Sequence, residues 1–157
     1  MKDKPTVTQS FYLAAVPIPQ VVLDTNVIVA GLRSRRGSAF RLLMLVGTGK
    51  FDIHLSVPLV LEYREVLLRE LSNLYISAID VENFIEYHCS VAIKHQIFFL
   101  WRPYLNDPKD DMILELSVAA ECDSVVTYNI RDFAGIEKFG VKAVMPAEFL
   151  REIGALS

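Results

Sequence analysis

The chain has 157 residues, a length that suits one domain with a sizeable buried core. Hydrophobic residues make up 52% of it and charged residues 22%, which excludes an intrinsically disordered protein. The net charge of −3 at neutral pH argues against a protein that coats nucleic acid by bulk attraction. A nuclease stays open, because metal-binding carboxylates themselves contribute negative charge.

The cysteines indicate a reducing, intracellular setting, and the N-terminal residues indicate no membrane-spanning segment. Cys89 and Cys122 have neither metal-ligand spacing nor a partner pattern, which favours an intracellular protein. The apolar run at residues 11–18 is too short to span a membrane and contains Pro17. We therefore expect a cytoplasmic protein with no membrane partner.

The predicted elements alternate between strands and helices. Residues 1–19 read as an irregular lead-in, and residues 20–157 read as one domain. In chain order we expect a strand at 20–24, helices at 26–32 and 38–46, a strand at 51–57, helices from 58 to about 71 and at 79–93, a strand at 96–101, a helix from 110 or 111 to 121, strands at 123–127 and 141–145, and a closing helix at 146–153. This order predicts an α/β fold, a three-layer sandwich around a central, mainly parallel, five-stranded sheet.

Acidic residues stand where these elements begin or end. Asp24 closes the first strand, Glu62 lies near the start of the helix after the second strand, and Asp132 follows the fourth strand. Ligands of such sheets bind beyond the carboxyl ends of the strands. Carboxylates gathered there repel one another unless a cation joins them. The pattern therefore predicts a divalent-metal site and phosphodiester chemistry.

Each acid also has a purely structural interpretation. Asp24 fits a helix N-cap, and Glu62 fits an early helical acid stabilised by the helix dipole. At about 100° per residue, Glu62 falls on the border of the apolar stripe of its helix, so its side chain can point toward the cleft at the carboxyl ends of the strands. Asp107, Asp110 and Asp111 exceed what one helix cap requires, so at least one of them is a candidate ligand.

Two further groups are weaker candidates. Asn129 and Asp132 fit an Asx turn after a strand, although they share the predicted edge with Asp24. The basic residues that follow the first helix ordinarily form a solvated face, but here they are candidates for guiding a phosphate backbone. They are Arg33, Arg35, Arg36 and Arg41.

Three segments together resemble the PIN-domain family. They are Val-Leu-Asp-Thr-Asn-Val-Ile at 22–28, Asp-Pro-Lys-Asp-Asp at 107–111 and Val-Thr-Tyr-Asn-Ile-Arg-Asp-Phe at 126–133. The likeness spans roughly residues 20–150 in the order of the family's motifs. It is greatest to the branch that contains toxin components of toxin–antitoxin systems.

The resemblance implies a ribonuclease that depends on Mg²⁺ or Mn²⁺ and leaves a 5′-phosphate and a 3′-hydroxyl. Carried over by motif, the acids that bind metal and carry the catalysis are Asp24, Glu62 and Asp111, with Asp132 and Asn129 sharing the fourth position, where the family often has Asp. Supporting polar groups are Thr25, Asn26, Asp110 and Thr127. The implied partners are an RNA substrate, a cognate antitoxin and a second copy of the chain.

One other function stays compatible with the sequence, and two others are disfavoured by the residues present. A PIN-like module that binds RNA or a partner without appreciable cleavage is the alternative, with Asn129 marking a weakened site. A signalling receiver domain requires a phosphoacceptor Asp after the middle strand and a Lys near the last one, and the chain supplies neither. A haloacid-dehalogenase-type phosphatase requires a second Asp at position 26, which is Asn.

Overall fold

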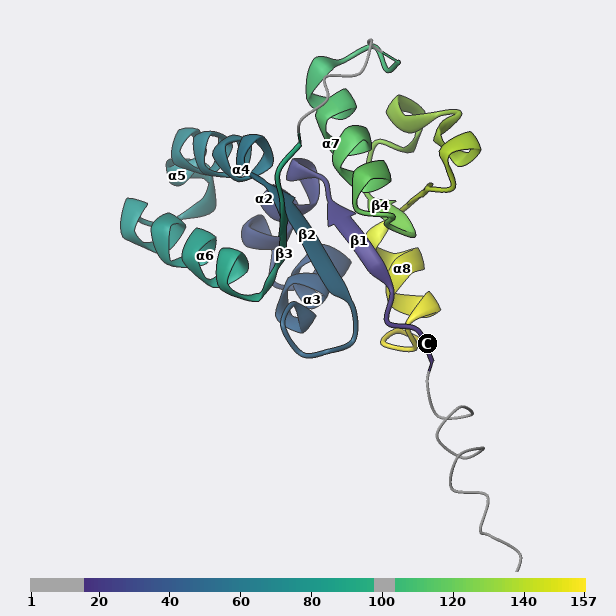
Figure 1. Cartoon of the computed structure of the whole chain (residues 1–157). Helices are drawn as coiled ribbons and strands as arrows, with labels where there is room; N and C mark the ends of the chain where they lie inside the picture. Colours follow the sequence, from purple (N-terminus) through teal and green to yellow (C-terminus); the bar gives the residue numbers. More distant parts are fainter. Residues whose placement is uncertain (1–15, 98–103) are drawn as a thin grey trace, which may run out of the picture.

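A computed structural model describes residues 16–97 and 104–157 of the chain. Five parallel strands form a sheet in the order β3-β2-β1-β4-β5, with helices on both faces (Figure 1). This confirms the predicted α/β class, and the sheet is wholly parallel where the sequence predicts a mainly parallel one. The strands are β1 (Gln20–Leu23), β2 (Asp52–Ser56), β3 (Ile93–His95), β4 (Ser124–Val126) and β5 (Lys142–Val144).

The helices fall on the two sides of this sheet. They are α2 (Thr25–Arg33), α3 (Ser38–Leu45), α4 (Val57–Arg69), α5 (Leu71–Leu74), α6 (Ala78–Val91), α7 (Pro108–Ala119) and α8 (Pro146–Glu152), with 3₁₀ turns η1 (Ile130–Phe133) and η2 (Ile136–Phe139). α7 packs against β1, β2 and β4 on one face, and α2 and α3 pack together on the opposite side (Figure 1). Of the helices in the described ranges, none has the length and apolar character needed to cross a lipid bilayer.

β1 is the centre of the sheet, between β2 and β4. Val21 and Val22 are fully buried and Leu23 is 2% exposed, because helices cover both faces of this strand. The chain runs outward from β1 to β2 and β3, then crosses to β4 and β5 on the other side. The strand order therefore reverses between β1 and β4, the position where open α/β sheets bind ligands. We call the edge formed by Leu23, Ser56 and Val126 the carboxyl edge.

The predicted strand at 96–101 is wrong in its position. β3 covers Ile93–His95, Gln96 and Ile97 lie outside any strand, and 98–101 falls outside the described residues. The predicted helix at 79–93 accordingly ends early, at Val91. β3 pairs with the last three residues of β2, so the neighbouring strand selects this segment, which local β-propensity does not reveal.

The helix that carries the aspartates begins earlier than predicted. α7 starts at Pro108 rather than at Asp110 or Asp111, and Asp107 caps it by accepting a hydrogen bond from the Lys109 amide at 2.9 Å. Proline suits the first helical turn, because its missing amide proton would have no partner there. Asp110 and Asp111 therefore both lie inside the first turn of α7.

We predict that Gly31→Ala destabilises the fold at the contact between α2 and α3. A Cβ on Gly31 would lie 2.4 Å from Leu43 Cδ1 and 3.2 Å from the Ala39 carbonyl carbon. Such overpacking is expected to lower the free energy of unfolding by about 1–3 kcal/mol in urea titrations. Gly37→Ala is the control, since its Cβ would meet no atom closer than 3.8 Å. Equal stability of the two variants would contradict this packing.

Candidate functional site

Asp24 directly follows β1 and is 7% exposed. It occupies the N-cap position of α2, but its side chain makes no capping hydrogen bond. Instead, Thr127 Oγ1 donates to Asp24 Oδ2 at 2.7 Å. Burial raises the pKa of Asp24, the hydrogen bonds from Thr127 and from the Thr25 backbone oppose this increase, and the charges of Glu62 and Asp132 add to it. The carboxylate thus faces the β1–β4 junction rather than capping the helix.

Glu62 reaches the same edge from α4. Ser56 ends β2 and caps α4 by accepting a hydrogen bond from the Leu59 amide at 3.4 Å, so the helix begins at the carboxyl edge. Thr25 Oγ1 donates to Glu62 Oε2 at 2.6 Å, and Lys109 Nζ lies 3.8 Å from Oε1. The Glu62 side chain is only 12% exposed. These contacts hold its carboxylate between α2 and α7.

Tyr63 supports this arrangement from the core. Its side chain is buried, and its hydroxyl donates to the carbonyl of Leu23, the residue before Asp24. Burial raises the pKa of Tyr63 well above its ordinary value, and the charges of Asp24 and Glu62 raise it further. The sequence gives no sign of this role beyond the position of Tyr63 on the apolar stripe of α4, next to Glu62.

The two aspartates in the first turn of α7 have different surroundings. Burial raises the pKa of Asp110 to about 7, and the negative charges of Asp24, Asp107, Asp132 and Glu62 contribute to this increase. Asp111 is 9% exposed, and its Oδ1 accepts hydrogen bonds from the amides of Leu105 at 2.7 Å and Tyr104 at 3.2 Å. Asp110 therefore belongs electrostatically to the acidic group, whereas Asp111 holds the segment before α7.

The remaining acid, Asp132, lies on η1 after β4. It is exposed, and its negative charge contributes to the raised pKa of both Asp24 and Asp110. We call Asp24, Glu62, Asp110 and Asp132 the acidic cluster. Four separate segments of the chain supply its members: the end of β1, α4, α7 and η1.

The amide side chains and Thr127 tie the β4 loop to Asp24. Asn26 Oδ1 accepts a hydrogen bond from the Tyr128 amide at 3.3 Å, and Asn26 Nδ2 lies 3.5 Å from Thr127 Oγ1. Thr127 Oγ1 also accepts from the Asn129 amide at 2.9 Å while it donates to Asp24. Among the described residues, the Asn129 side chain makes no hydrogen bond, and it lines a surface hollow together with Asp132.

The structure does not bring the basic group to this site. α2 starts at the carboxyl edge and its nine residues carry the chain about 13 Å away from it. Arg33 ends α2 and pairs with Glu70, which follows the last residue of α4, at 3.8 Å. Arg35 and Arg36 are exposed in the turn beyond Arg33. These arginines therefore lie toward the opposite end of the helices from the acidic cluster.

The acidic cluster has the donor chemistry of a hard divalent cation. Mg²⁺ prefers carboxylate oxygens and keeps several of its waters. Within the described ranges, however, no three His, Cys, Asp or Glu side chains are placed to hold one ion together. Burial is the largest cause of the raised pKa of Asp110, and a cation would offset the neighbouring negative charges that add to it. The residues thus fit a water-rich ion better than a cage made of protein ligands.

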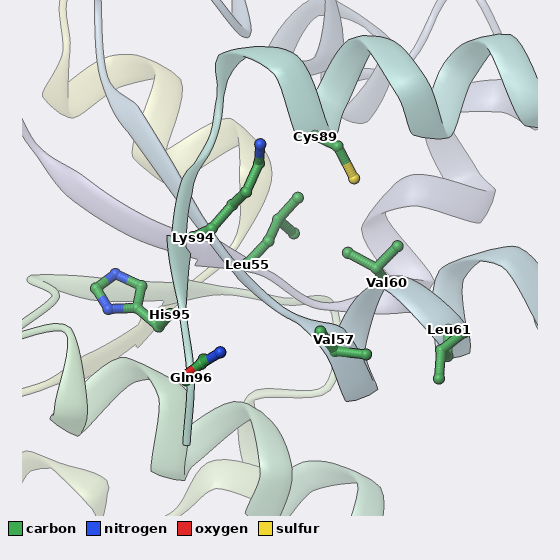
Figure 2. A pocket seen from close by; sticks show the side chains of 8 residues that line it. All are labelled: Leu55, Val57, Val60, Leu61, Cys89, Lys94, His95 and Gln96. Atoms are coloured by element: carbon green, nitrogen blue, oxygen red, sulfur yellow. The ribbon is translucent and has the colours of Figure 1, made fainter. Parts of the chain in front are cut away.

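A separate cavity of about 340 Å³ lies between α4, α6 and β3 (Figure 2). Val57, Val60 and Leu61 on α4 form much of its wall, Cys89 reaches it from α6, and Lys94 extends from β3 (Figure 2). None of the four acids lines it. This apolar cavity is therefore not where metal-dependent phosphodiester chemistry would take place.

Comparison with known families identifies the class of fold and site. The model of the PIN domain family matches residues 20–131, more than two thirds of the chain. The chain therefore belongs to the PIN-domain family. The match includes Asp24, Glu62 and Asp110 and stops one residue before Asp132. No curated protein matches the chain.

Seven chains of solved structures are similar. One belongs to the crystal structure of VapBC2 from Rickettsia felis bound to a DNA fragment from their promoter. It superimposes with a TM-score of 0.55 and 15% sequence identity, over 79% of this chain and 98% of that chain. At this identity the similarity concerns the fold, and it agrees with the five-stranded parallel sheet described above.

We predict opposite effects on stability for the two α7 aspartates. The pKa of Asp110 in the folded, metal-free protein is about 7, against 3.8 for an ordinary aspartate. Between these values the folded state binds more protons than the unfolded state, so the contribution of Asp110 to stability is present below about pH 4 and is lost as the pH rises through about 7. Asp110→Asn is therefore expected to raise the melting temperature in EDTA at about pH 8, with a smaller gain near pH 5.

Asp111→Ala serves as the comparison on the same helical turn. It removes the acceptor of the Tyr104 and Leu105 amides and is expected to lower the free energy of unfolding by about 1–3 kcal/mol. A melting temperature that Asp110→Asn leaves unchanged at both pH values would contradict the electrostatic description of the cluster.

Proposed function

We propose that this chain is a metal-dependent endoribonuclease that acts in the cytoplasm as the toxin of a toxin–antitoxin pair. The acidic cluster at the β1–β4 junction carries the proposal, because four distant segments each bring one carboxylate to the position where α/β sheets bind ligands. Family membership supports the nuclease class. The toxin role follows from the resemblance of the motifs to that branch of the family.

The proposed metal-binding groups are Asp24, Glu62, Asp110 and Asp132. Asp110 takes the role that the motif assigns to Asp111, because the charges of the other three acids act on Asp110, whereas Asp111 accepts two backbone hydrogen bonds. Asn129 is left out of the ligand group, because its side chain is a neutral amide and not one of the carboxylates that Mg²⁺ prefers. The arginines after α2 are given no role in substrate binding.

The bound Mg²⁺ or Mn²⁺ would supply an acidified water and offset the negative charge on the phosphate and the leaving oxygen. The protein groups prepare the site. Thr127 orients Asp24 by donating to Oδ2, and Thr25 orients Glu62 by donating to Oε2. Lys109 places a positive charge beside Glu62, which reduces the repulsion within the cluster and is suited to attract a phosphate.

A cognate antitoxin is the expected protein partner. A segment of the antitoxin that places a positively charged side chain or hydrogen-bond donors against the acidic cluster would block access of RNA. The cluster is accessible to such a segment, since Asp132 is exposed and Lys109 is 60% exposed. The homodimer stays a prediction from the sequence.

The test is cleavage of single-stranded RNA by the purified chain. We expect turnover with Mg²⁺ or Mn²⁺ and none with EDTA. Asp24→Asn, Glu62→Gln and Asp110→Asn are each expected to lower the rate by about 100-fold or more, since each removes a negative charge that helps to hold the cation, which in turn offsets the charge on the phosphate. The rate is measured with a labelled oligoribonucleotide under single-turnover conditions.

Two matched variants complete this experiment. Glu65→Gln removes an exposed acid from the same helix as Glu62, and Asp111→Asn keeps an oxygen that can accept the Tyr104 and Leu105 amides. Both are expected to stay within about threefold of the parent rate. Cleavage that survives EDTA, or that depends on Asp111 and not on Asp110, is incompatible with the proposed site.

A binding module without turnover is the second candidate. It is favoured by the absence, within the described residues, of three side chains placed to share one ion, and by Asn at position 129. Isothermal titration with Mg²⁺ and with RNA separates the two functions. A binding module keeps its RNA affinity in EDTA and shows no metal-dependent cleavage.

A further inference from the structure

A hollow of about 380 Å³ lies beside the acidic cluster, formed by Tyr128, Asn129, Ile130, Arg131 and Asp132. Asp132 belongs both to this hollow and to the acidic cluster, where its charge acts on Asp24 and Asp110. A group bound in the hollow is therefore adjacent to the proposed point of cleavage.

The hollow has a fixed position relative to Asp24. The Tyr128 amide donates to Asn26, and the Asn129 amide donates to Thr127, whose hydroxyl donates in turn to Asp24. A single hydroxyl thus links the wall of the hollow to the carboxylate. A ligand in the hollow would be positioned against the cluster by rigid contacts at the ends of β1 and β4.

The side chains of the hollow suit an unpaired nucleobase. Tyr128 and Ile130 expose 37% and 38% of their surface, so an aromatic side chain and an apolar neighbour are accessible to a ligand. Unpaired bases of RNA are bound by stacking on aromatic rings and by hydrogen bonds to their edges. Within the described residues, the side-chain amide of Asn129 and the guanidinium of Arg131 make no hydrogen bond or ion pair. They are free to contact a base edge and a phosphate.

We propose that the hollow is a nucleobase subsite, in which an unpaired base of RNA stacks on Tyr128 and the adjacent phosphodiester lies over the acidic cluster. The proposal rests on the function proposed above and deepens it, since it assigns named residues of this chain to one base of the substrate. Asn129 contacts the edge of the base through its amide, and Arg131 contacts the backbone. Asn129 is thus the residue that selects the base, whereas stacking on Tyr128 tolerates any base.

The test separates base stacking from cleavage. The probe is a short single-stranded oligoribonucleotide that contains one 2-aminopurine, whose fluorescence is quenched on stacking, and it is titrated with the full chain in EDTA. We expect quenching that Tyr128→Phe retains and that Tyr128→Ala removes, with affinity lower by about tenfold or more. Tyr75→Ala is the matched control, because Tyr75 is 94% exposed and is not part of the site. Thermal melting shows that each variant is folded.

A second measurement uses Mg²⁺ and the unmodified RNA. Tyr128→Ala should raise KM much more than it changes kcat, since stacking is retained from the bound substrate to the transition state. If the parent chain does not quench the probe, or if Tyr128→Ala binds as the parent does, the subsite is overturned. Cleavage that is unaffected by Tyr128→Ala overturns the subsite and leaves the nuclease standing. Quenching that depends on Tyr128 without metal-dependent cleavage supports the subsite and refutes the nuclease.

Discussion

The burial of carboxylates close to one another at the carboxyl edge is the constraint on which the arrangement of this site depends. Asp24 is nearly buried, and its carboxylate receives the Thr127 hydroxyl from a neighbouring strand. Glu62 receives the Thr25 hydroxyl and the charge of Lys109. Hydrogen bonds of this kind favour the ionised form, whereas burial and like charges oppose it. Burial and then the neighbouring negative charges raise the pKa of Asp110 to about 7.

The topology explains why these groups meet. Thr127 and Asp24 are separated by 103 positions in the chain and become neighbours because β4 pairs with β1 in parallel register. The crossover that carries the chain from β3 to β4 reverses the strand order at this junction. Loops diverge from each other at such a point and leave room for a ligand. The same pairing places the hollow formed by residues 128–132 beside the acidic cluster.

The PIN-domain family supplies a fold and a class of chemistry, and the details of the site come from this chain. The third acid lies on a helix, where successive side chains point about 100° apart. Asp110 and Asp111 are adjacent in the sequence, but the Asp110 carboxylate faces the acidic cluster and the Asp111 carboxylate accepts backbone hydrogen bonds. Asn129 likewise changes the edge of the site from an acid to an amide, which suits the recognition of a base edge.

The α/β class and the PIN-domain family could be predicted from the sequence, because apolar runs, turn residues and motif order are local properties of the chain. Asp24, Glu62 and Asp132 are recognisable from their positions at the ends of predicted elements. The sequence could not distinguish the surroundings of Asp110 from those of Asp111, since these depend on where α7 begins and on what its first turn faces. The sequence also could not show that Arg33, which lies on the first helix after Asp24, is at the end of that helix remote from the acidic cluster. The position of β3 and the support from Tyr63 depend on contacts between distant segments, and local sequence carries no record of them.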